Sequence, residues 1–265
     1  MDGMIVFACY AVILFLVSMV GAYLPQIRKL SDEQTHMLIA LGAGIFLGLL
    51  FLMLIPEAFH MAVGHEGKSY DTVALMFLIG FLLLAFVDTL IKHYHMASCP
   101  CECHQDEHRH EIYSISAFIG LSVHACCDGL SLAAALIGGE SIGFVALIGM
   151  CVHKFVVLFS LSSSLLLSID SMKQRWKYLT AFSLITPLAG VVFYLFMQGI
   201  HIDDFVGLPL AFAAGTFMFV TFCNMIPEAF HRKNNELKSF IIVFLGVVIA
   251  AVSIAITSVL GGHVH

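Results

Sequence analysis

The sequence YSISAFIGLSVHACCDGLSLAAALIGG, residues 113–139, runs directly into ESIGFVALIGMCVHKFVVLFSLSSSLLLS, residues 140–168. Each part is long and apolar enough to cross a bilayer as a helix, for which about 20 residues suffice. Gly138, Gly139 and Glu140 separate the two segments, and four ionisable side chains nevertheless lie well inside them, namely His124, Asp128, His153 and Lys154. A charge at the centre of a membrane helix costs roughly 2.5 to 3.5 kcal/mol on insertion scales. These residues are therefore the first candidates for a functional site.

The spacing of these residues indicates a metal site. His124 and Asp128 are four residues apart and Cys127 lies three after His124, so the three side chains share one helix face. At about 1.5 Å of rise per residue, His124 and His153 both fall near the middle of a core about 30 Å thick. Neutral imidazole and ionised carboxylate bind zinc. We expect His124, Asp128 and His153 to be ligands, with water or Cys127 as the fourth. Alternatively, these groups only join two helices, with Asp128 and Lys154 as a structural ion pair.

The overall composition places the chain in a membrane. It has 265 residues, of which 60% are hydrophobic and 11% charged, too few polar residues to cover a soluble globule of this size. The formal net charge of −6 and the scattered basic residues give no support to nucleic-acid binding. Five of the eight cysteines fall in apolar segments and three share one loop, which is not a disulfide framework.

Eight apolar segments are long enough to cross a membrane, so we predict an all-α membrane protein with eight transmembrane helices. They cover residues 4–24, 36–60, 72–92, 113–137, 141–168, 178–199, 205–230 and 239–260. Ten of the twelve Lys and Arg residues lie in the connections after spans one, three, five and seven. The positive-inside rule then places these connections in the cytosol and both termini outside.

An internal repeat links span two to span seven. ALGAGIF at residues 40–46 leads to MLIPEAFH ending at His60, and AFAAGTF at residues 211–217 leads to NMIPEAFH ending at His231, an offset of 171 throughout. Since the two spans cross in opposite directions, we predict an inverted repeat of spans 1–3 and 6–8 around spans 4–5, as in secondary transporters. Glu57 then lies at the outer mouth of a pathway, and Glu228, with Asn224 before it, at the inner one. Alternatively, Pro-Glu-Ala merely ends a helix at the membrane surface.

The long connection at residues 93–111 is rich in metal-ligand side chains. Its imidazoles and thiols are His93, His95, Cys99, Cys101, Cys103, His104, His108 and His110. Their spacing matches no closed zinc finger, so we expect a flexible cytoplasmic metal-binding loop with reduced thiols. A polar linker that happens to be rich in His is the alternative. The isolated His36, His65, His263 and His265 are given no role.

Taken together, these residues resemble the ZIP (Zrt/Irt-like) family of divalent metal transporters over nearly the whole chain. The family's fourth span carries His-x-x-x-(Asp/Glu)-Gly, matched by His124, Asp128 and Gly129, and its fifth span opens a metal motif with His, matched by His153. The resemblance implies uptake of zinc, and of iron or manganese as further options, through a site between spans four and five. It also implies movement of spans one, four, five and six against the rest.

The sequence departs from the family pattern at the second metal position. Many relatives have Asn after the span-four His, and an acidic residue, Pro and a second ligand in span five. Here these positions read Ala125, Lys154, Val156 and Val157. The chain is similar to the branch whose fifth span reads His-Lys, and the ammonium of Lys154 is expected to occupy the space of a second ion.

Two functions remain at this point. The first is a secondary transporter, formed by one domain over residues 1–265, that moves zinc as its substrate into the cytosol by alternating access. We do not expect it to be an enzyme or to hold a prosthetic group. Its expected partners are divalent ions and the lipid bilayer, with a homodimer as a further possibility. The alternative is a zinc-dependent intramembrane hydrolase, in which the metal activates water. No His-Glu-x-x-His motif is present.

Overall fold

A computed structural model describes residues 3–27, 31–65, 67–98, 105–197, 207–230 and 236–260, and all regular structure in these ranges is helical. The α-helices are α1 Gly3–Tyr23, α2 Asp32–Leu49, α3 Ile55–Phe59, α4 Tyr70–Ser98, α5 Gln105–Gly138, α6 Glu140–Ser168, α7 Met172–Met197, α8 Gly207–Phe219, α9 Ile226–Ala229 and α10 Glu236–Leu260. Shorter turns join some of them: the 3₁₀ turn η1 Leu24–Gln26 and the π-helical turns η2 Leu50–Leu54, η3 His60–His65 and η6 Val220–Met225.

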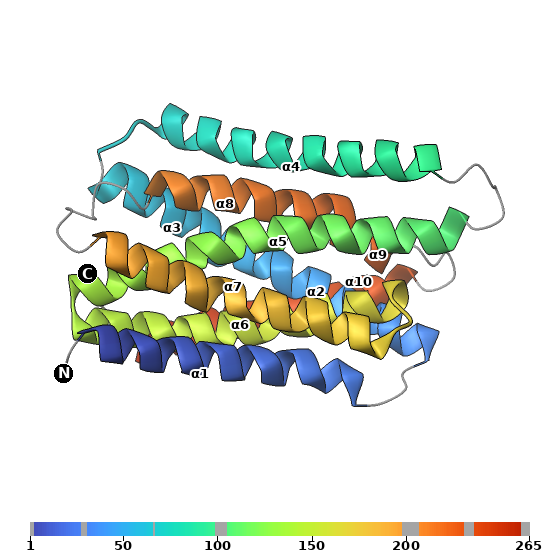
Figure 1. Cartoon of the computed structure of the whole chain (residues 1–265). Helices are drawn as coiled ribbons and strands as arrows, with labels where there is room; N and C mark the ends of the chain where they lie inside the picture. Colours follow the sequence, from blue (N-terminus) through green and yellow to red (C-terminus); the bar gives the residue numbers. More distant parts are fainter. Residues whose placement is uncertain are drawn as a thin grey trace.

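The helices lie roughly parallel and antiparallel in one bundle (Figure 1). The start of α1 and the end of α10 lie at the same end, which we call the terminal end. The opposite end, which we call the basic end, carries the starts of α7 and α10 with Lys173, Arg175, Lys177 and Lys238. The helix α3 with Glu57 lies toward the terminal end, and α9 with Glu228 lies at the basic end (Figure 1).

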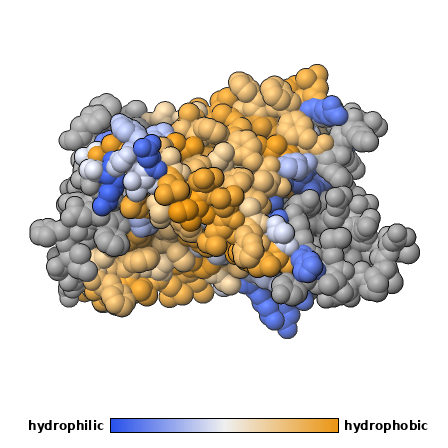
Figure 2. All heavy atoms as spheres, turned by 90° about the horizontal axis from the view of Figure 1, so that it is seen from above, coloured by the Kyte–Doolittle hydropathy of each residue, from blue (hydrophilic) through white to orange (hydrophobic). Residues whose placement is uncertain are grey.

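Eight helical segments of the described chain are long and apolar enough to span a membrane. Their bounds follow the eight predicted segments closely, and the predicted all-helical fold is confirmed. Large apolar side chains are exposed along the outside of the bundle, among them Leu82, Phe86, Phe196, Phe244 and Val252. Apolar residues fill the middle of the face seen in Figure 2, with hydrophilic residues toward its ends. An apolar belt of this kind suits contact with lipid rather than water.

The helices form two groups by their packing. The first group comprises α1, α5, α6 and α7, which pack on one another. In the second group α10 packs on α2 and α4 packs on α8. The groups meet chiefly where α6 contacts α2 and where α5 contacts α8. Since the side chains of α5 and α6 therefore reach the boundary between the groups, a site on these helices sits next to that boundary.

A polar network holds the first group together at the basic end. The Ser162 hydroxyl donates to the carbonyl oxygen of Ala22 at 2.7 Å and accepts from the Gln26 amide at 3.0 Å. Arg175 donates to Gln26 at 3.1 Å and to the carbonyl oxygen of Ile169 at 2.6 Å, just after the end of α6. These bonds satisfy terminal carbonyl groups that helices leave open, and they tie α1, α6 and α7 to one another.

The two copies of the sequence repeat have the same local form. In each copy an α-helix passes into a π-helical turn, followed by a short α-helix with Pro in its first turn. A proline lacks the N–H for the helical ladder and crowds the preceding turn, which a wider π turn accommodates. Residues 171 apart also touch: the rings of Phe46 and Phe217 lie 4.8 Å apart, and those of Phe51 and Phe222 lie 6.3 Å apart.

Candidate metal centre

Three metal-ligand side chains meet between α5 and α6. The His124 Nε2 atom lies 3.2 Å from His153 Nε2 and 3.4 Å from an Asp128 carboxylate oxygen. The other oxygen of Asp128 lies 3.7 Å from His153 Nε2. All three residues are buried, with 0%, 4% and 3% of their surface exposed for His124, Asp128 and His153. Among the described residues, these three form the cluster whose ligand atoms all lie within 4.8 Å of one another.

The separations in this cluster match those of ligands on one ion. Zinc takes nitrogen and oxygen ligands at about 2.0–2.2 Å, so two ligands of a tetrahedral site lie roughly 3.3–3.6 Å apart. The measured 3.2, 3.4 and 3.7 Å bracket this spacing. Two imidazoles and one carboxylate also form a ligand set that suits zinc and leaves one coordination position open.

The buried carboxylate of the centre is neutralised by a lysine. Lys154 Nζ lies 2.6 Å from Asp128, and Lys154 is only 2% exposed. An ammonium at this distance compensates a carboxylate that would otherwise be expensive to bury. The Lys154 ammonium also lies 5.5 Å from the ring centre of Phe182 on α7, within the range of a cation–π contact. The Asp128–Lys154 ion pair, which the sequence offered within the alternative interpretation, is therefore present beside the metal-ligand cluster.

One aromatic ring, that of Phe217, closes the centre toward α8. The ring of Phe217 lies 4.7 Å from that of His124 and 6.5 Å from that of His153. In the described part of the chain, the Nδ1 atoms of both histidines have no hydrogen-bond partner. The polar contacts of the two imidazoles are thus made by Nε2, on the side where Asp128 lies.

Small residues on α5 allow α7 to come close beside the centre. A side chain at Gly129 would overlap the backbone of Thr186 and Gly190. The Thr186 hydroxyl donates to the carbonyl oxygen of Ala125 at 2.9 Å, and Ala125 is fully buried. The Gly that follows Asp128 is therefore explained by helix packing, and a larger residue at Ala125 would meet α7 or the core.

The position of a second metal ligand is apolar. Val157, one turn after His153, is fully buried and belongs to the main core cluster with Phe46 and Phe217. Cys127 is half-buried and is not part of the three-residue cluster. The structure thus brings together His124, Asp128, His153 and Lys154, and it leaves the fourth ligand to water or another group.

The remaining predicted pathway residues lie outside the centre. Glu57 is exposed. Asn224 on η6 is buried, and neither atom of its amide has a hydrogen-bond partner in the described residues. Glu228 lies 3.7 Å from Nδ1 of His36, to which the sequence had given no role. The partner is distant in sequence, so no local pattern indicated this contact.

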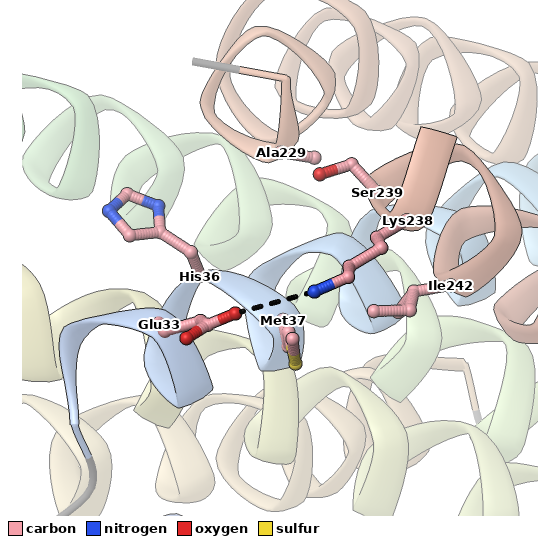
Figure 3. Close-up of a pocket in the computed structure, with 7 residues that line it drawn as sticks. All are labelled: Glu33, His36, Met37, Ala229, Lys238, Ser239 and Ile242. Atoms are coloured by element: carbon pink, nitrogen blue, oxygen red, sulfur yellow. Dashed lines mark ion pairs between the residues drawn. The ribbon is translucent and has the colours of Figure 1, made fainter. Parts of the chain in front are cut away.

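The position of His36 is set by the capping box with which α2 begins. The Ser31 hydroxyl accepts a hydrogen bond from the Gln34 N–H at 3.3 Å, and the Ser31 N–H donates to the Gln34 side chain at 3.0 Å. His36 therefore falls in the second turn of α2, beside a pocket at the basic end that Glu33, Met37, Ala229, Lys238, Ser239 and Ile242 also line (Figure 3).

The predicted metal-binding loop lies largely outside the described residues. This holds for Cys99, Cys101, Cys103 and His104. The flanking parts of the predicted segment 93–111 are helical, since α4 continues to Ser98 and α5 begins at Gln105. His93 is exposed, and the side chains of His95, His108 and His110 are among those not described.

With its apolar helices and its buried cluster of metal ligands, the chain has the features of a polytopic membrane protein that handles metal ions. The sequence model described as "ZIP Zinc transporter" matches residues 4–111 and 100–254. The chain therefore belongs to the ZIP family and is an integral, multi-pass membrane protein. The resemblance seen in the sequence is confirmed, and so is the expectation that the chain is not an enzyme, because members of this family are transporters.

Individual relatives agree with this assignment. The chain is 25% identical over 258 residues to "Zinc transporter ZIP9-B" of Xenopus laevis, covering 82% of this chain and 84% of that protein. It is 31% identical over 116 residues to "Zinc transporter ZIP9" of Macaca fascicularis, covering 42% of this chain and 49% of that protein. It is also 28% identical over 153 residues to "Zinc transporter ZIP1" of Danio rerio, covering 56% and 49%.

Proposed function

We propose that this protein is a secondary transporter that carries zinc across its membrane into the cytosol, one ion at a time, through the centre formed by His124, Asp128 and His153. The observation that carries the proposal is the buried cluster of two imidazoles and one carboxylate at the ligand spacing of one ion. The zinc transporters among its relatives support the same cargo. Iron and manganese remain further candidates, because nitrogen and oxygen ligands bind them as well.

The inward direction follows from charge. The Lys and Arg residues concentrate in the connections at the basic end, including those of the α6–α7 connection and the start of α10. The positive-inside rule assigns this end to the cytosol and both termini to the outside. Glu57 then belongs to the outer approach to the centre and Glu228 to the inner one.

Alternating access is the mechanism that the packing favours. The centre belongs to the group of α1, α5, α6 and α7, and it faces Phe217 of the other group. Small residues line the boundary between the groups: Gly42 on α2 packs so closely on Ser160 of α6 that a side chain on Gly42 would overlap it. A rocking or sliding movement of one group against the other would expose the centre to each side in turn. The inverted arrangement of the repeat, supported by the touching Phe pairs, provides two such states of similar form.

Single-ion transport is supported by Lys154. Its ammonium occupies the side of Asp128 where a second ion would sit, and the buried Val157 offers no ligand there. When the centre is empty, this ammonium compensates Asp128, so the unloaded carrier can return without a substitute cation. We expect Lys154→Ala to lower the free energy of unfolding by about 3–5 kcal/mol, since it leaves a carboxylate buried without its ammonium. Thermal unfolding of the purified protein measures this loss, and Lys154→Arg, which keeps the charge, is the matched variant.

Uptake of radioactive zinc into sealed proteoliposomes tests the proposal. His153→Ala should abolish saturable uptake, while Ser183→Ala, which removes a buried hydroxyl that donates to the carbonyl oxygen of Leu179 within α7, should leave it near the wild-type rate. Both variants must be inserted and folded to the same extent. Full uptake by folded His153→Ala protein would refute the assignment of the centre. Absence of zinc uptake by the wild type would refute transport and reopen the hydrolase alternative.

The role of the Cys/His loop in transport is better tested by substitution than by deletion. Because α4 reaches Ser98 and α5 starts at Gln105, deleting the whole segment would leave no connection between two antiparallel helices. Replacing Cys99, Cys101, Cys103 and His104 by Ser keeps the connection. We expect this variant to transport zinc at near the wild-type rate, with altered regulation or apparent affinity. Complete loss of uptake by the folded variant would place the loop in the pathway.

A further inference from the structure

A second pair of metal-ligand side chains lies at the basic end, away from the centre. His36 Nδ1 and a carboxylate oxygen of Glu228 are 3.7 Å apart, and the two side chains are 19% and 13% exposed. This separation exceeds the usual length of a hydrogen bond, about 2.7–3.2 Å, but equals the longest ligand separation in the centre, Asp128 to His153. The pair joins α2 to α9 across the end of the bundle.

The two charged side chains that line the neighbouring pocket, Glu33 and Lys238, are paired with each other. Glu33 and Lys238 lie 3.9 Å apart and are 50% and 62% exposed. In Figure 3 the dashed line joins this pair, and the imidazole of His36 points away from it. The positive charge of Lys238 is therefore directed at Glu33, and the His36 imidazole lies beside Glu228.

Two buried polar groups lie on elements that carry this pair or pack against it, Asn224 on η6 just before α9 and Ser160 on α6 against α2. Asn224 precedes Glu228 by four residues, about one helical turn, and both atoms of its amide are without a partner in the described chain. The Ser160 hydroxyl of α6 is fully buried and also unpartnered there. It packs on Gly42, which lies on α2 about 9 Å along the helix from His36. A buried polar group without a partner costs roughly 1–3 kcal/mol, so two of them in this place call for an explanation.

We propose that His36 and Glu228 form a second divalent-cation site, at the basic end, that receives the ion released from the centre. Asn224 is the group placed to supply a further oxygen ligand. Ser160 and Asn224 line the way to this site and gain partners, water or the passing ion, when the helix groups separate. The inference rests on the proposed transport of zinc through the centre, and it adds a release site to it. With His36 and Glu228 as its two close ligands, both partly exposed, this site has one close ligand fewer than the buried centre and binds more weakly, as release requires.

Cobalt absorption spectroscopy can detect this site directly. In a full-length background with all eight cysteines replaced by Ser, His36→Cys should give a near-ultraviolet Co²⁺–thiolate band on titration with Co²⁺. Adding Glu228→Gln should weaken or abolish the band. Leu38→Cys, two residues along α2 and thus on another face of the helix, is the matched control and should give none. No band in folded His36→Cys protein, or a band that is indifferent to Glu228→Gln, would overturn the release site.

Uptake kinetics in the otherwise unchanged protein give a second test. His36→Gln removes a ligand of the release site but none of the centre, so we expect a lower maximal rate with the same half-saturating zinc concentration. Glu33→Gln, in the same pocket, should change neither value. An unchanged maximal rate for His36→Gln would contradict the inference. This failure is distinct from that of the proposed function, in which the wild type itself takes up no zinc or His153→Ala keeps full uptake.

Discussion

The two copies of the repeat are alike in packing and different in polarity. Gly44 of α2 and Gly215 of α8 are equivalent, and each lies against a backbone carbonyl of its neighbour, Val243 of α10 or Phe77 of α4. Phe46 and Phe217 are equivalent and touch each other beside the centre. The close helix packing is thus the same in both copies. This indicates that both halves of the scaffold depend on it to the same extent.

The polar residues of the two copies do not correspond in the same way. Where the second copy has the buried Asn224, the first copy has the partly buried Met53. The acidic residues of the two copies also differ in environment, since Glu228 in the second copy lies beside His36 whereas Glu57 in the first copy is exposed. We infer that the packing residues build the scaffold, while the polar residues are specialised for the side on which the ion leaves.

Among substitutions within the repeat, the largest losses of stability are expected at packing positions that are equivalent in the two copies. A Cβ at Gly44 or Gly215 would overlap the carbonyl oxygen on the facing helix, so Gly44→Ala and Gly215→Ala should each cost about 1–3 kcal/mol through overpacking. Thermal unfolding of purified protein measures both losses. Gly64→Ala is the control, because only a side-chain atom of His60 lies near that position, at 4.0 Å. A large loss of stability on substitution of one glycine and none on substitution of its equivalent would show that the two copies do not depend on the same packing.

An intermediate effect is expected where the copies differ. Asn224→Leu removes an unpartnered buried amide, so we expect the free energy of unfolding to rise by about 1 kcal/mol or more while zinc uptake falls. Met53→Asn introduces an amide into the first copy and should lower uptake far less than Asn224→Leu. Unfolding temperature and initial uptake rate are measured on the same preparations. A less stable Asn224→Leu protein with full uptake would show that the amide supports the fold and not the route.

The smallest effect concerns the exposed ion pair between α2 and α10 at the basic end. Glu33 and Lys238 are half-exposed or more, and pairs of this kind contribute about 0–1 kcal/mol. We expect Lys238→Gln to leave both the unfolding temperature and zinc uptake close to the wild type. A strong loss of uptake would mean that Lys238 acts on the ion at the release site, and the pocket in Figure 3 would then need a different explanation.

Much of the fold and the centre could be predicted from the sequence, because both leave local signals. The eight spans follow from runs of apolar residues, which lipid requires of any crossing helix. His124, Asp128 and His153 stand out because ionisable side chains are costly in such runs. The His124–Asp128 spacing of four residues then places both on one face, and the structure brings them to 3.4 Å.

The sequence could not indicate contacts between distant segments. His36 and Glu228 are far apart in the chain, and a lone His near a helix start carries no local signal for its partner. Cys127 was expected as an alternative to water at the fourth position, and the three-residue cluster does not include it, although its spacing places it on the same helix face. The unpartnered state of Asn224 depends on its neighbours in three dimensions.

The most direct test of the central claim is to locate the ion. Crystals of the protein grown with Cd²⁺, a soft analogue of zinc, give an anomalous difference map that marks each bound ion. We predict one ion between His124, Asp128 and His153, with Lys154 beside it and no second ion within the centre; a weaker peak at His36 and Glu228 would agree with the release site. Two ions bridged at the centre, or none there at saturating Cd²⁺, would contradict the account.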